Sequence, residues 1–293
     1  MKKLLVFGVG LIGGSLALAL KAANAGWHVT GIGRTGDSLQ EALTLGIIDE
    51  AATDIATALK GVDVIMIATP VAQIGPILQR IAPHLEDKTI ITDAGSTKAD
   101  IANEAHKLLG NAASRFVPGH PIAGAEKSGP SAAQATLYKN KNVVLTPDGR
   151  TDPGAVQIVR ELWLSTGAIV REMSPEGHDT IFAAVSHLPH LLAFALVDEL
   201  AARPDAEQFF EFAASGFRDF TRIAGSSPEM WRDISLANRT ALLQELDRYQ
   251  SALNQLRQSL EHGDAASLQA TFERASQARN AWAQHSPSAL WKN

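Results

Sequence analysis

The chain contains no cysteine, and this absence excludes several kinds of chemistry. The protein can form no disulfide, use no thiolate nucleophile and bind no zinc through cysteine sulfur. The composition is compatible with a reducing compartment, so we expect a cytoplasmic protein. A large charge excess is missing as well, since the formal net charge is −5 over 293 residues. This balance predicts neither a nucleic-acid partner nor attachment to a membrane surface.

Internal repeats and low-complexity tracts are also absent from the sequence, and the first 172 residues instead alternate two kinds of pattern. Short continuous apolar runs are typical of parallel strands that are buried on both faces. We expect such strands within residues 3–10, 28–34, 63–70, 88–95, 141–147 and 168–173. The segments between them show helical patterns, as βαβ crossovers require. The sequence therefore predicts an α/β domain over residues 1–172 with a Rossmann-type doubly wound sheet.

Residues 173–293 have a different character, with long apolar helical patterns. We expect helices within residues 178–202, 207–226 and 228–263. His187 and His190 make the first of these too polar for a membrane span. A single small helical layer could not cover so much apolar surface, so we predict an all-α C-terminal domain that forms a homodimer. The active site is expected in the cleft between the two domains.

Three glycines follow the first expected strand with the spacing G-x-G-x-x-G. Gly8 permits a tight turn, Gly10 lets the backbone approach a pyrophosphate, and Gly13 lets the helix pack closely on the strand. The start of the helix then offers free N–H groups and a positive dipole end to the phosphates. The first 26 residues also resemble a secretory signal peptide, but the glycine spacing fits a dinucleotide site better.

The second expected strand lacks the acidic residue with which NAD-binding domains usually hold the ribose 2′-hydroxyl. Gly33 occupies the expected position and Arg34 follows it, whereas the nearest acid is Asp37. An arginine without an adjacent acid suits a 2′-phosphate, so we predict NADP in preference to NAD. Thr35 and Ser38 can add hydroxyl donors. The alternative is that Arg34 is an ordinary solvated side chain.

A histidine with unusual neighbours comes next. His120 lies between Gly119 and Pro121, and the proline rules out a helix interior, so we expect an irregular loop around one imidazole. Ser96 and Lys98 directly follow a strand that should end at the ligand-binding edge of the sheet. These polar groups are therefore candidates for one site.

The helical half adds polar side chains within apolar segments. Ser186, His187 and His190 lie in one helical pattern, with the two histidines about one turn apart. Asp219 and Arg222 lie in the next. The histidine pair mimics a metal site, but no matching carboxylate set is evident, so we predict no metal.

Five motifs occur in the same order in the prephenate/arogenate (cyclohexadienyl) dehydrogenase family of tyrosine biosynthesis, which the chain resembles from about residue 3 to residue 280. They are GVGLIGGS (8–15), TDAGSTK (92–98), GHPIAGAEKSG (119–129), SHLPH (186–190) and GFRDFTRIA (216–224). The resemblance implies oxidative decarboxylation of prephenate or arogenate. A hydride leaves the carbinol carbon of a cyclohexadiene ring for the nicotinamide, the ring carboxylate leaves as CO2, and the ring becomes aromatic.

The resemblance also implies roles for individual residues. His120 hydrogen-bonds the substrate hydroxyl and accepts its proton, and Ser96 contacts the same hydroxyl and orients the histidine. Arg222 anchors a substrate carboxylate with its planar fork, and Glu126 belongs to a network near the substrate side chain. The residues expected to line the substrate pocket are Ser186, His187, His190 and Asp219. The residues expected to contact the cofactor are Gly8, Gly10, Leu11, Ile12, Gly13, Gly33, Arg34, Thr35, Thr69, Pro70 and Ser96.

Two rival functions are weighed against this one. β-Hydroxyacid dehydrogenases share the Rossmann-plus-helical plan but use a lysine as the main catalytic group, which Lys98 could supply. A non-catalytic protein that senses NADP would bind the cofactor without turnover. The motifs around His120 and Arg222 argue against the first alternative. The sequence does not choose between prephenate and arogenate, which differ only in a keto or an amino group.

Overall fold

A computed structural model describes residues 1–33, 35–124 and 127–285 of the chain. The chain divides into two compact units, residues 1–239 and residues 240–293. The first unit contains both sheets and the helices up to residue 237, and the described part of the second contains two long helices.

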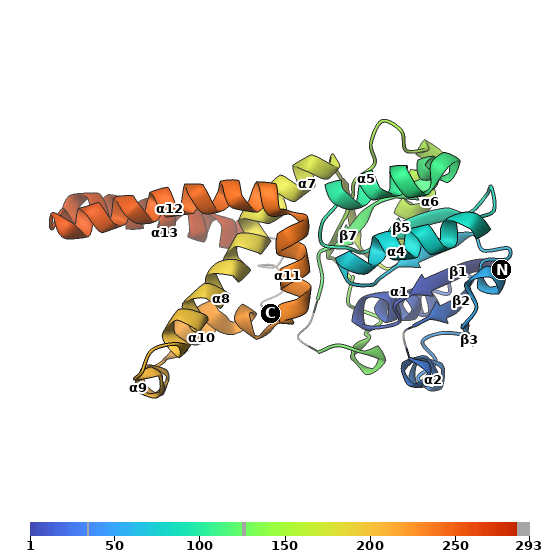
Figure 1. Cartoon of the computed structure of the whole chain (residues 1–293), viewed down its shortest axis with the longest axis horizontal. Coiled ribbons are helices and arrows are strands. Elements are labelled where there is room, and N and C mark those ends of the chain that lie inside the picture. Colours follow the sequence, from blue (N-terminus) through green and yellow to red (C-terminus); the bar gives the residue numbers. More distant parts are fainter. Residues whose placement is uncertain (34, 125–126, 286–293) are drawn as a thin grey trace. The chain divides into compact units, whose positions relative to one another are not determined.

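The first unit is built on a parallel sheet with the strand order β3-β2-β1-β4-β5-β6 (Figure 1). Its strands are β1 (Lys2–Phe7), β2 (Trp27–Ile32), β3 (Glu50–Ala51), β4 (Val64–Ile67), β5 (Ile90–Asp93) and β6 (Phe116–Val117). The direction of winding reverses between β1 and β4, which is the point where doubly wound sheets bind ligands. The predicted Rossmann-type sheet is confirmed.

Helices cover both faces of this sheet, which explains why its strands are apolar throughout. These helices are α1 (Leu11–Ala22), α2 (Gly36–Thr44), α3 (Ile55–Ala58), α4 (Val71–Ile81), α5 (Ala99–Leu108) and α6 (Pro153–Leu164). Alternate residues of β1 enter opposite core clusters, Leu4 and Val6 on one face and Leu5 and Phe7 on the other. Side chains of α1, α2 and α6 complete the first cluster, and those of α3, α4 and α5 complete the second. Short 3-10 turns also occur: η1 (Ala82–His84), η2 (Gly110–Arg115) and η3 (Pro130–Ala132).

A second, smaller sheet contains the candidate histidine. Its strands are β7 (Gly119–Pro121), β8 (Asn142–Leu145) and β9 (Ile169–Glu172), in that order. The expected strands at 141–147 and 168–173 therefore belong to this sheet and not to the large one. The expectation of an irregular loop at His120 is wrong, because His120 pairs with Val144 in an antiparallel ladder. Pro121 is tolerated because it ends a strand at the edge of the sheet, where a missing N–H costs little.

The remainder of the first unit is helical. Its elements are α7 (Pro175–Phe182), η4 (Ala183–His187), α8 (Leu188–Ala201), α9 (Ala206–Glu211), α10 (Ser215–Thr221), η5 (Arg222–Gly225) and α11 (Pro228–Ala237). The segment η4 is a π-helical turn. Pro189 follows it and has no N–H to bond the carbonyl group four residues earlier, so the α-helical ladder opens here. By length and composition alone, Pro175–Ala201 could cross a membrane, a test that buried core helices also pass.

The second unit, as far as it is described, consists of α12 (Arg239–Glu261) from residue 240 onward and α13 (Ala265–His285). Gly263, with a φ of +62°, lies in the turn that joins them. The single helix expected over residues 228–263 is wrong in one respect, because α11 ends at Ala237 and α12 begins at Arg239. The predicted helical character of the C-terminal part is confirmed.

Candidate active site

The glycine loop after β1 has the close approaches that its spacing predicts. Gly8 has a φ of +89°, and a Cβ atom there would lie 2.5 Å from the carbonyl oxygen of Ala68 on the neighbouring strand end. A Cβ atom at Gly13 would lie 2.3 Å from the carbonyl oxygen of Gly8. Neither position can accept a side chain without movement of the backbone. The two glycines therefore hold α1 tightly against the end of β1.

Gly10 differs from its neighbours, since a Cβ atom there would meet nothing within 4 Å. It directly precedes α1, whose first residues Leu11 and Ile12 carry N–H groups without helical acceptors. The hydroxyl of Tyr138 donates to the carbonyl oxygen of Ile12 at 2.6 Å and fixes the first turn. Across the switch point, the buried Thr69 Oγ1 finds no hydrogen-bond partner among the described residues. Open space, free amides and an unused hydroxyl fit a dinucleotide phosphate.

Other predicted cofactor residues lie at the starts of α4 and α2. Pro70 directly precedes α4 as its N-cap. At the end of β2, Gly33 is followed by Arg34, which lies outside the described residues. Thr35 caps α2, because its Oγ1 accepts from the N–H of Ser38 at 3.4 Å. The end of β2 thus presents a helix N-terminus and hydroxyl groups.

A buried ion pair stands at the carboxyl end of β5. Lys98 is fully buried, forms an ion pair with Asp93 and donates to the carbonyl oxygen of Gly119 at 2.7 Å. Asp93 also accepts from the N–H groups of Gly119 at 3.1 Å and of Gly95 at 2.7 Å. The Lys98 ammonium is thus enclosed and occupied, so its position suits holding β7 against β5 and not direct attack on a substrate.

His120 lies next to this ion pair, on β7, with part of its surface accessible. Its Nδ1 is 2.8 Å from the Nε2 of His178, on α7. Desolvation lowers the pKa of His120 well below its usual range, and the nearby His178 and Lys98 lower it further. The imidazole is therefore neutral at physiological pH and has a lone pair with which to accept a proton.

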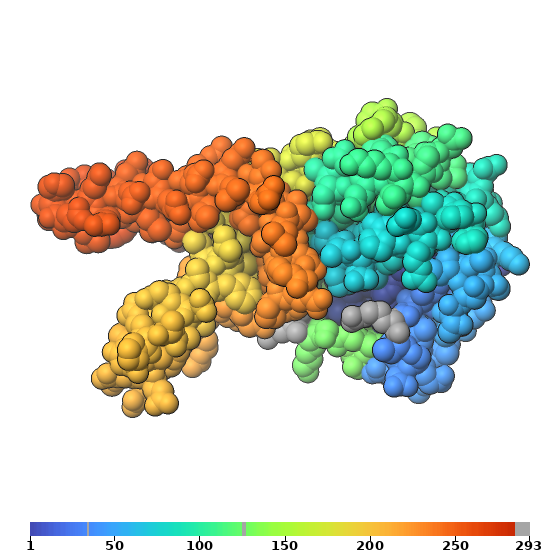
Figure 2. All heavy atoms as spheres, in the orientation of Figure 1, coloured from blue at the N-terminus to red at the C-terminus, as the bar shows by residue number. Residues whose placement is uncertain are grey.

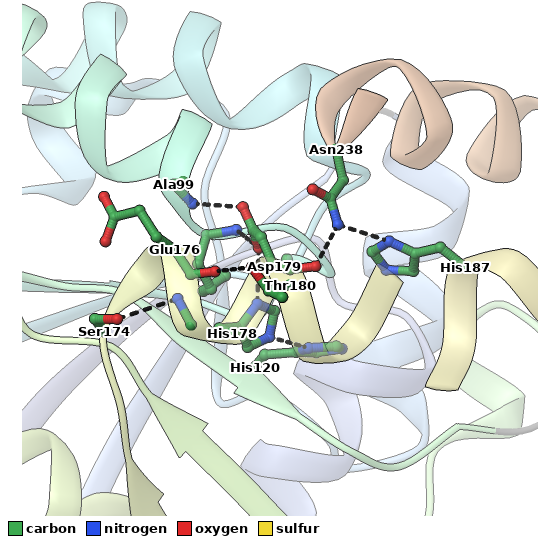
Figure 3. Close-up of polar contacts among 12 residues, drawn as sticks. Ala99, His120, Ser174, Glu176, His178, Asp179, Thr180, His187 and Asn238 are labelled. Carbon is green, nitrogen blue, oxygen red and sulfur yellow. Dashed lines mark hydrogen bonds and ion pairs between the residues drawn. The ribbon is translucent and has the colours of Figure 1, made fainter. Parts of the chain in front are cut away.

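His178 and Asp179 are site residues that the sequence analysis missed (Figure 3). The Nδ1 of His178 lies 2.8 Å from Oδ1 of Asp179, whose two oxygens also accept from the N–H groups of Lys98 and Ala99, each at 2.9 Å. Burial lowers the pKa of His178, and the hydrogen bond to Asp179 opposes this effect. The only local signal was the adjacent polar residues His178 and Asp179 at the start of an apolar helical pattern.

The two histidines of SHLPH have different partners. His190 donates from Nδ1 to the carbonyl oxygen of Ser186 at 2.9 Å, and its ring stacks on Trp231 with centroids 3.5 Å apart. His187 is buried, and Asn238 donates to its Nδ1 at 3.1 Å. Burial lowers the pKa of His187 to about 4, while the backbone of Ser96 nearby opposes this effect. Hence His187 packs beside the predicted Ser96 turn.

Two further predicted substrate residues lie on the surface of the helical part. Arg222 begins η5 and Asp219 lies on α10, and both side chains are exposed. The positive charge of Arg222 is close enough to lower the pKa of His190, in addition to the larger effect of burial. Glu126 lies outside the described residues. The structure thus groups His120 with the Ser96 turn, and Arg222 with His190.

No group of three or more metal-ligating side chains occurs in the described part of the chain. The site consists of a phosphate-binding loop, a neutral imidazole held by a second histidine, and a cation near the SHLPH helix.

Two family models match the chain: "Prephenate dehydrogenase, nucleotide-binding domain" over residues 16–172 and "Prephenate dehydrogenase, dimerization domain" over residues 174–274. The chain belongs to the prephenate dehydrogenase family.

Relatives agree with this membership along nearly the whole chain. A prephenate dehydrogenase of Bacillus subtilis is 39% identical over 94% of this chain and 75% of its own length. A cyclohexadienyl dehydrogenase of Zymomonas mobilis is 34% identical over 95% of each. The solved prephenate dehydrogenase of Aquifex aeolicus, in complex with hydroxyphenyl propionate and NAD+, matches with a TM-score of 0.90 at 37% identity, over 95% of this chain and 97% of that one. Synechocystis arogenate dehydrogenase matches with a TM-score of 0.82 at 31% identity, over 96% and 99%.

These findings confirm the resemblance on which the sequence analysis rested, and place the chain among the dehydrogenases of tyrosine biosynthesis. The rival assignment to the β-hydroxyacid dehydrogenases loses its basis. The prephenate dehydrogenase family binds its cofactor through the nucleotide-binding domain that residues 16–172 match. The roles of the individual site residues stay predictions.

The two kinds of glycine in the loop can be separated by experiment. Gly13→Ala should destabilise the fold by about 1–3 kcal/mol, because its methyl group forces the Gly8 backbone to move. Gly10→Ala should cost less than about 1 kcal/mol but weaken cofactor binding, because the methyl group takes the space that a pyrophosphate needs. Urea denaturation measures the first effect and fluorescence titration with cofactor the second. Equal loss of stability in the two variants would contradict this reading of the loop.

Proposed function

We propose that this enzyme oxidatively decarboxylates prephenate, arogenate or both, to 4-hydroxyphenylpyruvate or tyrosine respectively. The observation that carries the proposal is the neutral imidazole of His120, held by His178 beside the switch-point edge of the nucleotide-binding sheet. Membership of the prephenate dehydrogenase family supplies the substrate class. Turnover assays with both substrates test the proposal, and cofactor binding without turnover of either would refute it.

The residues of the site can be given roles in this reaction. When bound, the nicotinamide supplies the acceptor for the hydride that leaves the carbinol carbon. His120 accepts the hydroxyl proton as the carbinol becomes a carbonyl, and Ser96 on the adjacent turn orients that hydroxyl. As the C–CO2 bond breaks, its electron pair enters the ring, and His120 returns the proton to the oxygen at the former carbinol carbon. The same imidazole thus takes up the proton in the first step and returns it in the second.

Replacing His120 tests its role as the base. His120→Asn should lower kcat by roughly 10²- to 10⁴-fold, the usual share of a general base, with little change in KM. The amide cannot take up a proton, but it keeps a similar size and polarity. Steady-state kinetics measure the effect, and an unchanged affinity for the cofactor provides the control. Near-normal turnover would remove His120 from the mechanism.

Arg222 is the proposed anchor for a substrate carboxylate. Arg222→Ala should raise the substrate KM at least roughly tenfold, since a charged hydrogen bond contributes about 1.5–3 kcal/mol. The KM for the cofactor should not change. Arg203→Ala is a matched control, because Arg203 is another exposed arginine of the helical part and pairs with Glu199. The assignment fails if both variants keep the substrate KM of the unaltered enzyme.

NADP is the proposed preferred cofactor, supported by the absence of an acid at Gly33, the adjacent Arg34 and the start of α2. A 2′-phosphate brings about two negative charges, which an aspartate at this position would repel. Arg34 can pair with the phosphate, while Thr35 and Ser38 can donate hydroxyl hydrogens. The dipole of α2, whose N-cap is Thr35, favours negative charge at the same place.

The cofactor preference can be tested by a charge exchange. Gly33→Asp with Arg34→Ile should shift kcat/KM toward NAD, because a charged hydrogen bond corresponds to roughly 10- to 150-fold in affinity. Gly33→Ala is the control for the added Cβ atom, which would lie 3.2 Å from the flexible side chain of Leu39. The proposal is wrong if the unaltered enzyme already prefers NAD, or if the double variant keeps its cofactor ratio.

We further propose that the enzyme is a cytoplasmic homodimer whose nucleotide-binding domain is residues 1–172 and whose dimerisation domain is residues 173–293. The match of residues 174–274 to a dimerization domain supports this assembly. Large apolar side chains in this part are exposed, among them Phe212 at 76% and Leu236 at 64%. Figure 2 shows the part of this surface that α8 and α9 contribute on the face in view. A second copy of the chain would bury such surface.

A further inference from the structure

We propose that His178 and Asp179 are positioning residues, which keep a proton on Nδ1 of His120 and so leave its Nε2 free to receive the proton of the substrate. The three side chains form one hydrogen-bonded row from α7 to β7 (Figure 3). The part of this inference that concerns the reaction rests on the proposed function. The protonation pattern itself does not, since it follows from the resting structure.

The row begins at the carboxylate of Asp179, whose two oxygens both act as hydrogen-bond acceptors. Asp179 accepts from two backbone N–H groups at the start of α5, those of Lys98 and Ala99, each at 2.9 Å. Amide donors and the positive end of a helix dipole both favour the charged form of a carboxylate. An ionised carboxylate can only accept hydrogen bonds. The Nδ1 of His178, which lies 2.8 Å from Oδ1 of Asp179, must therefore carry a hydrogen and donate it.

The second step fixes the other ring. His178 is fully buried, and burial lowers its pKa, so the ring is neutral and carries one proton. With that proton on Nδ1, the Nε2 of His178 is an acceptor. It lies 2.8 Å from Nδ1 of His120, which must then be the donor. A neutral His120 with its proton on Nδ1 has a bare Nε2, as a base for the substrate hydroxyl requires.

The opposite arrangement is unfavourable at the contact between His178 and Asp179. If His178 carried its proton on Nε2, the lone pair on Nδ1 would face the Asp179 carboxylate at 2.8 Å. The position of the row is fixed as well. Asn238 donates to the backbone carbonyl oxygen of Asp179 at 2.8 Å, and the ring of His178 stacks on Phe182 with centroids 4.4 Å apart. Once His120 has taken the proton, its Nδ1–H still donates along a row that ends in negative charge.

The protonation pattern can be observed directly in the unaltered enzyme. Protein labelled with ¹⁵N in its histidines, studied by NMR with cofactor bound at neutral pH, should show a neutral His120 with hydrogen on Nδ1. His120→Asn identifies the signal, because that variant lacks it. A neutral His120 with hydrogen on Nε2 overturns the proposal. This measurement needs no turnover, so a failure of the proposed reaction and a failure of this inference are distinguishable.

A pair of substitutions tests whether the pattern matters for catalysis. His178→Gln can present its amide oxygen to Nδ1 of His120 and its NH2 group to Asp179, whereas His178→Leu can do neither. The leucine variant should lose at least about 10- to 100-fold in kcat with little change in KM, as expected when a base is held in the wrong tautomer. The glutamine variant should recover most of that loss and keep the Nδ1–H signal. Full activity of the leucine variant overturns the proposal, and so does a glutamine variant no better than leucine.

Discussion

The fully buried pair of Lys98 and Asp93 is the interaction on which the geometry of the site depends. Lys98 donates to the carbonyl oxygen of Gly119, while Asp93 accepts from the N–H of the same residue, so both backbone groups of Gly119 are fixed. His120 is the next residue on this strand. A buried ion pair adds little net stability, because desolvation of both charges offsets their attraction. Here the pair fixes the geometry of the site, because its two side chains hold the backbone of Gly119. Removal of either partner would also leave an uncompensated charge beside the base.

Asp179 connects this geometry to the start of α5. Its carboxylate accepts from the N–H groups of Lys98 and Ala99, in the turn that also carries Ser96. The same carboxylate orients His178 and, through it, His120. The segment that begins the helical half is therefore fastened to the ligand-binding edge of the sheet by hydrogen bonds of the active site itself. Correct packing and correct protonation depend on the same contacts.

The sequence was sufficient for features that local patterns encode. The strand and glycine pattern predicted the nucleotide-binding sheet, and the ordered motifs predicted the family. It was not sufficient where the structure depends on contacts between residues far apart in the sequence. The strands β8 and β9 look like further members of the large sheet, because an apolar run does not specify its partner. Likewise, Asn238, between α11 and α12, donates to the backbone carbonyl oxygen of Asp179, which lies 59 residues away in the sequence. His178 and Asp179 were missed for the same reason.

Two physical explanations could account for the missing acid at the end of β2. Either packing requires glycine there, or an acid would repel the phosphate of the proposed cofactor. Packing could require glycine at residue 33, since a Cβ atom there would lie 3.2 Å from Cγ and Cδ2 of Leu39. That contact is with a flexible side chain, however, and Gly33 is not among the glycines with positive φ. Gly8 and Gly13 are different, because their Cβ atoms would meet backbone carbonyl oxygens at 2.5 and 2.3 Å. A modest shift of the Leu39 side chain would admit an aspartate at residue 33. In the glycine loop after β1, by contrast, the backbone itself would have to move. Packing therefore requires glycine in the loop after β1 but not at residue 33. At the end of β2, the remaining constraint on the residue is the chemistry of the bound cofactor.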